Sequence, residues 1–173
     1  MKSWFLNLRI RLKLIVGFSV MILFMVIIGL TGFQSTRHIQ KNLDEMFLVR
    51  MPAMDYLIEA DRDLHQLLVA ERSMIFSDSS SDIFRRFVEF YEENLMQSDR
   101  RWKKYKALAS TPEEFDIISE YDAAREEWKA VSGKVVEMCL TGSQAEKASA
   151  MELSIGIAKV KFQNMRAYID QLT

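Results

Sequence analysis

Turn-forming residues are scarce in this chain of 173 residues. It contains only six glycines and two prolines. These are too few for the many turns of a β-sandwich or a β-barrel, so long helices are the expected elements. The single cysteine, Cys139, excludes an internal disulfide and has no neighbouring Cys or His with which to form a metal site. The fold class that we predict is therefore all-α.

The motifs of common enzymes are also missing. The sequence has no nucleophile and base at triad-like positions, no glycine-rich phosphate loop, no HExxH motif and no paired-carboxylate motif. The net charge of -1 gives no general reason to bind nucleic acid, because acidic and basic side chains are closely interspersed after Phe33. We therefore expect no enzyme, no cofactor, no metal and no nucleic-acid partner.

One long uncharged stretch stands out near the N-terminus. Residues 14–33 read LIVGFSVMILFMVIIGLTGF, and twenty helical residues at about 1.5 Å each cover the roughly 30 Å hydrocarbon core of a bilayer. A cleavable signal peptide is the alternative, but its apolar region is shorter, and a small-x-small cleavage site is not evident here. The stretch predicts a transmembrane helix.

The flanking charges give this helix a direction. Residues 1–13 carry Lys2, Arg9, Arg11 and Lys13 and no acidic residue. By the positive-inside rule this basic juxtamembrane segment is cytoplasmic. Residues 34–173 are then expected outside the cytoplasm, in the periplasm or the extracellular space.

Three breaks divide residues 34–173 into four helices. The first break, residues 77–82, consists of serines and aspartates that favour turns and caps. At the second, Thr111 and Glu114 form a capping box around Pro112; at the third, Gly142 stops one helix and Ser143 caps the next. The helices should span about 34–76, 82–109, 112–140 and 143–173.

Each helix carries an apolar stripe with spacings of three and four residues, the pattern of a bundle with coiled-coil-like packing. In the first helix, Pro52 should cause a kink near Met51. The stripe of the last helix runs without a break through Ala148, Met151, Ile155, Ala158, Phe162, Met165, Ile169 and Leu172. We predict an N-terminal transmembrane helix followed by an up-down antiparallel four-helix bundle. Because the last helix is shorter than the first, we expect it to be truncated from a longer parent.

Four charged residues interrupt these stripes. Arg50, Asp61 and Glu71 lie in the first helix, and Arg125 lies in the third. Unpaired burial of charge is costly, so Arg125 is expected to reach Asp61 or Glu71 if helices one and three approach each other. Two interpretations of this buried polar seam stay open: a polar pocket or register device, and an edge position open to water.

The layout resembles the N-terminal half of methyl-accepting chemotaxis proteins with a four-helix-bundle sensor. The resemblance covers all 173 residues, and its most specific part is the run FLNLRIRLKL at residues 5–14 leading into VGF at residues 16–18. It implies a homodimer in the bacterial inner membrane that binds a small ligand or a periplasmic binding protein and passes a displacement down its last helix. The same bundle is similar to sensors of histidine kinases and cyclases, and a stand-alone membrane-anchored scaffold is a further alternative.

The resemblance also implies a ligand site. Arg62, His65 and Arg72 lie near one face of the first helix. In amino-acid-sensing members of the family, arginines of this helix clamp a ligand carboxylate at the dimer interface, a role that suits the planar guanidinium. The alternative is a solvated flank that pairs with the neighbouring acidic residues.

Overall fold

The computed structural model describes residues 9–173. Most of them are helical, and this part of the chain contains no β-strand, which confirms the all-α class. Residues 1–8 of the predicted basic segment 1–13 lie outside the described residues. The chain divides into two compact units, one ending at Leu48 and the other spanning Val49–Thr173. Each unit is described by itself.

The first unit contains α2 (Ile10–Glu45), in which no residue is buried. The predicted membrane stretch 14–33 lies within it. In the described part of the chain, the helical segment Ile10–Phe76 is the one segment that is long and apolar enough to cross a membrane. An apolar surface of this length matches the hydrocarbon core of a bilayer.

A π-helical turn, η1 (Met46–Arg50), precedes Pro52 where a kink is expected from the sequence. A proline interferes with helical hydrogen bonding in the turn before it. A π-helical turn changes that bonding pattern locally. The regular α-helical hydrogen bonding is therefore interrupted by one π-helical turn directly before α3.

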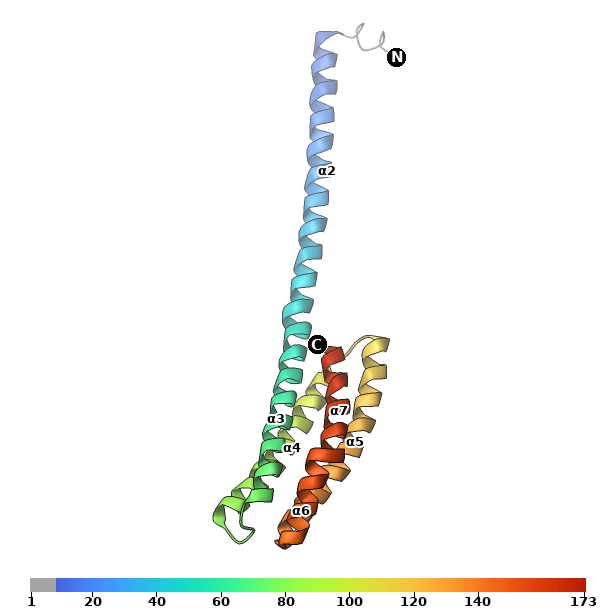
Figure 1. The fold of residues 1–173 in the computed structure, drawn as a ribbon. Coiled ribbons are helices and arrows are strands. Elements are labelled where there is room, and N and C mark those ends of the chain that lie inside the picture. Colours follow the sequence, from blue (N-terminus) through green and yellow to red (C-terminus); the bar gives the residue numbers. More distant parts are fainter. Residues whose placement is uncertain (1–8) are drawn as a thin grey trace. The chain divides into compact units, whose positions relative to one another are not determined.

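The second unit is a four-helix bundle in which each helix runs antiparallel to the one before it (Figure 1). Its first three helices are α3 (Met51–Phe76), α4 (Asp82–Lys106) and α5 (Pro112–Thr141). The fourth comprises α6 (Gln144–Leu153), the π-helical turn η2 (Ser154–Ala158) and α7 (Lys159–Leu172). The closest packing is between α3 and α4, while α5 packs on α6 and α7, and α3 also contacts α5 and α6.

Local capping fixes the ends of these helices. The Thr111 hydroxyl accepts a hydrogen bond from the Glu114 amide at 3.2 Å, and the Glu114 carboxylate accepts one from the Thr111 amide at 2.9 Å. Gly142 ends α5 with a φ of 76°, a left-handed conformation that glycine adopts without steric cost. Ser143 then caps α6 through the Glu146 amide at 3.2 Å. Each cap uses residues within five positions of one another.

The interior is filled mainly by large apolar and aromatic side chains. All four helices contribute side chains to this core. The ring of Trp102 stacks on that of Tyr105 at a centroid distance of 5.2 Å and contacts that of Tyr121 at a centroid distance of 4.1 Å. The largest fully buried apolar and aromatic side chains are those of Trp128, Tyr105, Tyr121, Phe84, Leu57, Leu64, Leu67, Met74, Met165 and Val135.

The predicted stripe of the last helix is correct only in its second half. Ala158, Phe162, Met165 and Ile169 are buried as expected. Before η2, however, Ala150 and Ser154 are buried, whereas Met151 and Ile155 are 39% and 54% exposed. A π-helical turn holds more residues per turn than an α-helix, so the buried face shifts by one residue across η2.

Candidate functional site

One layer of the bundle core is polar, and each of the four helices contributes one side chain to it. We call the set Glu71, Tyr91, Ser132 and Ser154 the polar layer. The Glu71 carboxylate accepts hydrogen bonds from the Ser132 hydroxyl at 2.5 Å and the Ser154 hydroxyl at 2.6 Å. The hydroxyls of Tyr91 and Ser132 are 2.9 Å apart. This layer therefore joins all four helices at a single level.

Glu71 is fully buried. Burial raises the pKa of its carboxyl, while the Ser132 and Ser154 hydroxyls and the charge of Arg72 lower it by smaller amounts. Burial also raises the pKa of Tyr91, and the nearby Glu71 charge adds to that increase. Among the described residues no ion pair joins Glu71 to a cation, so hydroxyl groups alone hydrogen-bond to this carboxylate.

Arg125, the second buried member of the predicted polar seam, faces α4. Its side chain is 3% exposed and donates to the Asp99 carboxylate at 2.8 and 3.1 Å. It also donates to the Ser98 hydroxyl at 2.7 Å and the Tyr121 hydroxyl at 2.9 Å. The expectation that Arg125 reaches Asp61 or Glu71 is wrong, because acceptors on α4 and on its own helix take up its guanidinium.

The other two seam residues are less enclosed. Asp61 is partly buried and accepts two hydrogen bonds from Arg166 of α7, at 2.5 and 3.0 Å. The carboxylate of Asp61 raises the pKa of Arg166. Arg50 is exposed and pairs with Glu114 at 3.3 Å. Arg50 therefore lies at an edge of the bundle that is open to water.

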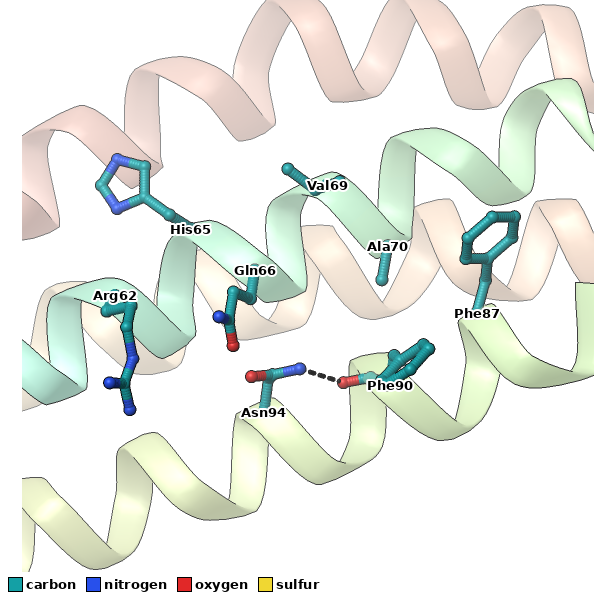
Figure 2. A pocket seen from close by; sticks show the side chains of 8 residues that line it. All are labelled: Arg62, His65, Gln66, Val69, Ala70, Phe87, Phe90 and Asn94. Atoms are coloured by element: carbon teal, nitrogen blue, oxygen red, sulfur yellow. Dashed lines mark hydrogen bonds between the residues drawn. The ribbon is translucent and has the colours of Figure 1, made fainter.

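A mainly apolar hollow lies between α3 and α4 and has a volume of about 530 Å³. We call it the α3–α4 groove. Figure 2 shows the carboxamides of Gln66 and Asn94 in its middle, Arg62 at one end, and the rings of Phe87 and Phe90 at the other. The groove is lined by Arg62, His65, Gln66, Val69, Ala70, Phe87, Phe90 and Asn94. It thus combines an apolar wall with one cation and no acidic lining residue.

Two of the three predicted ligand residues line this groove. The Nη2 atom of Arg62 lies 3.4 Å from Asp63 and 3.7 Å from Glu59, and both of these acids also pair with Arg101 of α4. Because Arg101 shares these acids, the Arg62 guanidinium makes only long contacts with them. Its Nε and Nη1 atoms are not used in those contacts.

His65 is held in place within the bundle. Its Nδ1 atom lies 2.9 Å from the Asp61 carbonyl oxygen, which is an acceptor, so Nδ1 carries the hydrogen in this contact. Its ring packs edge-on against Phe162 of α7 at a centroid distance of 5.4 Å. Arg72, the third predicted residue, does not line the groove, and its Nε atom is buried without a hydrogen-bond partner.

The α4 side of the groove was not predicted from the sequence. Phe87, Phe90 and Asn94 are three and four residues apart and form a second face of α4 beside the buried stripe. That spacing is the signal that could have identified them. Asn94 is 7% exposed, and its amide nitrogen donates to the Phe90 carbonyl at 2.7 Å.

Comparison with protein families connects these features to a function. The model of the four-helix bundle sensory module for signal transduction matches residues 7–173. The chain belongs to this family. Comparisons with curated proteins and with solved structures each found no significant match.

As a sensory module, the chain offers two kinds of polar site. The α3–α4 groove is open to solvent and can admit a small molecule, whereas the polar layer is enclosed and can act only through the helices that it joins. Across residues 9–173, no group of three or more His, Cys, Asp or Glu side chains is placed to hold a metal ion.

Proposed function

We propose that this chain is the ligand-sensing part of a transmembrane chemoreceptor. In this proposal α2 crosses the bacterial inner membrane with the N-terminus in the cytoplasm, and the bundle lies in the periplasm. The chain acts as a homodimer without catalysis and relays occupancy of its site to signalling modules. Family membership and the apolar stretch in α2 support this proposal.

The α3–α4 groove is the observation that carries the sensing role. Its wall is mostly apolar, and Arg62 is the one charged residue that lines it. An anionic head group would lie at Arg62, because a guanidinium binds a carboxylate through two parallel hydrogen bonds. The body of the ligand would lie against Phe87 and Phe90. The ligand class is therefore a small carboxylate with an aromatic or branched apolar body.

A thermal-shift assay on the full chain in detergent micelles tests this assignment. The probes are benzoate, phenylacetate and isovalerate, each compared with its uncharged alcohol. A ligand that binds only the folded state at a hundredfold excess over its Kd stabilises that state by about 2.7 kcal/mol, which for a bundle of this size is roughly 10 °C in Tm. At least one carboxylate should raise Tm more than its alcohol does.

Matched variants locate the binding. Arg62→Gln should abolish the preference for a carboxylate over its alcohol, and Phe90→Ala should weaken the binding of all of the probes. Arg100→Gln, which removes an exposed arginine of α4 outside the groove, should bind as the wild type does. If no carboxylate shifts Tm, the groove is not the site of a small anionic ligand, and a periplasmic binding protein becomes the better partner to test.

A further inference from the structure

The fourth helix of the bundle is compatible with two registers. In the structure its buried face follows Ala150, Ser154, Ala158 and Phe162, three successive steps of four residues that span η2. The sequence also contains an unbroken stripe of three- and four-residue steps that uses Met151 and Ile155 in place of Ala150 and Ser154. A regular α-helix without η2 would bury this second stripe.

The two registers differ by one residue before η2. One residue corresponds to about 100° of rotation and 1.5 Å of translation in an α-helix. The second register would enclose Met151 and Ile155, which are 39% and 54% exposed in the structure. It would therefore bury more apolar surface, which is a stabilising change.

The polar layer accounts for the register that is observed. Ser154 is the first residue of η2, and its hydroxyl donates to Glu71 at 2.6 Å. In the second register Ile155 would take the place of Ser154 beside this carboxylate. A buried carboxylate that loses a hydrogen-bond donor is strongly destabilised, which opposes the gain from burying Ile155.

We propose that the fourth helix is a two-register switch and that Glu71 selects the register through Ser154. With the carboxylate bonded to Ser154, η2 is present and Ala150 faces the core. When that bond is lost, η2 reverts to a regular α-turn, α6 rotates by one residue and Met151 faces the core. This device does not depend on the ligand class proposed for the groove.

Cysteine accessibility distinguishes the two registers. In the full chain in detergent micelles, with Cys139→Ala to remove the native thiol, Ala150→Cys and Met151→Cys are labelled separately with a maleimide. With Glu71 present, position 151 should react roughly tenfold faster than position 150, because a buried thiol reacts only after local opening. With Glu71→Met the order should invert. With Glu71→Gln, whose amide oxygen still accepts from Ser154, the order should stay.

Deletion of Ile157, an exposed residue within η2, provides a second test. The deletion shortens the step from Ser154 to the next buried residue from four residues to three. The buried residues are then spaced by alternating steps of four and three, in the order Ala150, Ser154 and the former Ala158, Phe162 and Met165. A regular helix with this spacing keeps the observed register. In this background, a cysteine at position 151 should still react with the maleimide faster than one at position 150 when Glu71→Met is added. The proposal is wrong if Glu71→Met, folded by circular dichroism, labels like the wild type, or if it also inverts the order in the deletion background.

Discussion

Replacement of Arg125 by alanine should be among the most destabilising single changes in the bundle. The guanidinium donates to Asp99, Ser98 and Tyr121. Hydrogen bonds that involve a charged group contribute about 1.5–3 kcal/mol, and a buried hydroxyl left without its partner costs about 1–3 kcal/mol. Tyr121 is fully buried and becomes such a hydroxyl. Asp99 is half exposed and can return to water, so its share is small. We expect a loss of about 3–5 kcal/mol in the free energy of unfolding.

Urea unfolding of the full chain in micelles, followed by circular dichroism, measures this loss. The matched control is Lys129→Ala on the same helix, which removes an exposed ion pair with Glu126 and should cost no more than about 1 kcal/mol. A double-variant cycle makes the test sharper. In the Tyr121→Phe background no orphaned hydroxyl remains, so Arg125→Ala should cost about 1 kcal/mol less. A loss below about 1 kcal/mol, or strict additivity with Tyr121→Phe, would refute the reasoning.

Three further predictions concern protonation and capping. Burial raises the pKa of Glu71 above its ordinary 4.5, so the folded chain holds the proton to higher pH than the unfolded chain. Stability should therefore fall as pH rises from 4.5 through the folded-state pKa, and urea titrations of Glu71→Gln should lack this decline. Gly142 has a φ of 76°, so Gly142→Ala should lower the free energy of unfolding by about 1–2 kcal/mol. Gly133 has open space around it, so Gly133→Ala should raise the free energy of unfolding by about 0.5–1 kcal/mol. Equal effects of the two substitutions would contradict the argument from the left-handed conformation of Gly142. Thr111→Ala should cost about 1 kcal/mol in thermal unfolding, and Thr111→Ser should restore most of it.

The helix ends and the core of the bundle could be predicted from the sequence because their determinants are local. Thr111 and Glu114 cap a helix with atoms three residues apart, and Gly142 adopts a left-handed conformation that its own lack of a side chain permits. Periodicity likewise identifies a buried face within one helix. Family membership was predictable for a different reason, since it follows from the order of the apolar stretch and the four helices along the chain.

The partners across helices could not be predicted in this way. Arg125 could pair with any acid that the packing brings near, and the close approach of α5 to Asp99 of α4 decided the choice. Arg166 was the unrecognised partner of Asp61. The groove was missed on its α4 side for a related reason: Phe87 and Phe90 flank the main stripe, and only the packing of α3 on α4 makes them one wall.

The register of the fourth helix shows why periodicity alone misled. An unbroken apolar stripe predicts a regular helix, but it says nothing about the groups that the stripe will meet. Here it would bring Ile155 against Glu71, and the loss of a hydrogen bond to a buried carboxylate opposes the gain from burying Met151 and Ile155. An apolar residue in place of Glu71 would remove this conflict and could make the bundle more stable. A polar layer that is costly in stability but fixes one of two registers is consistent with a sensory module, because a relay requires an element with two arrangements of similar free energy.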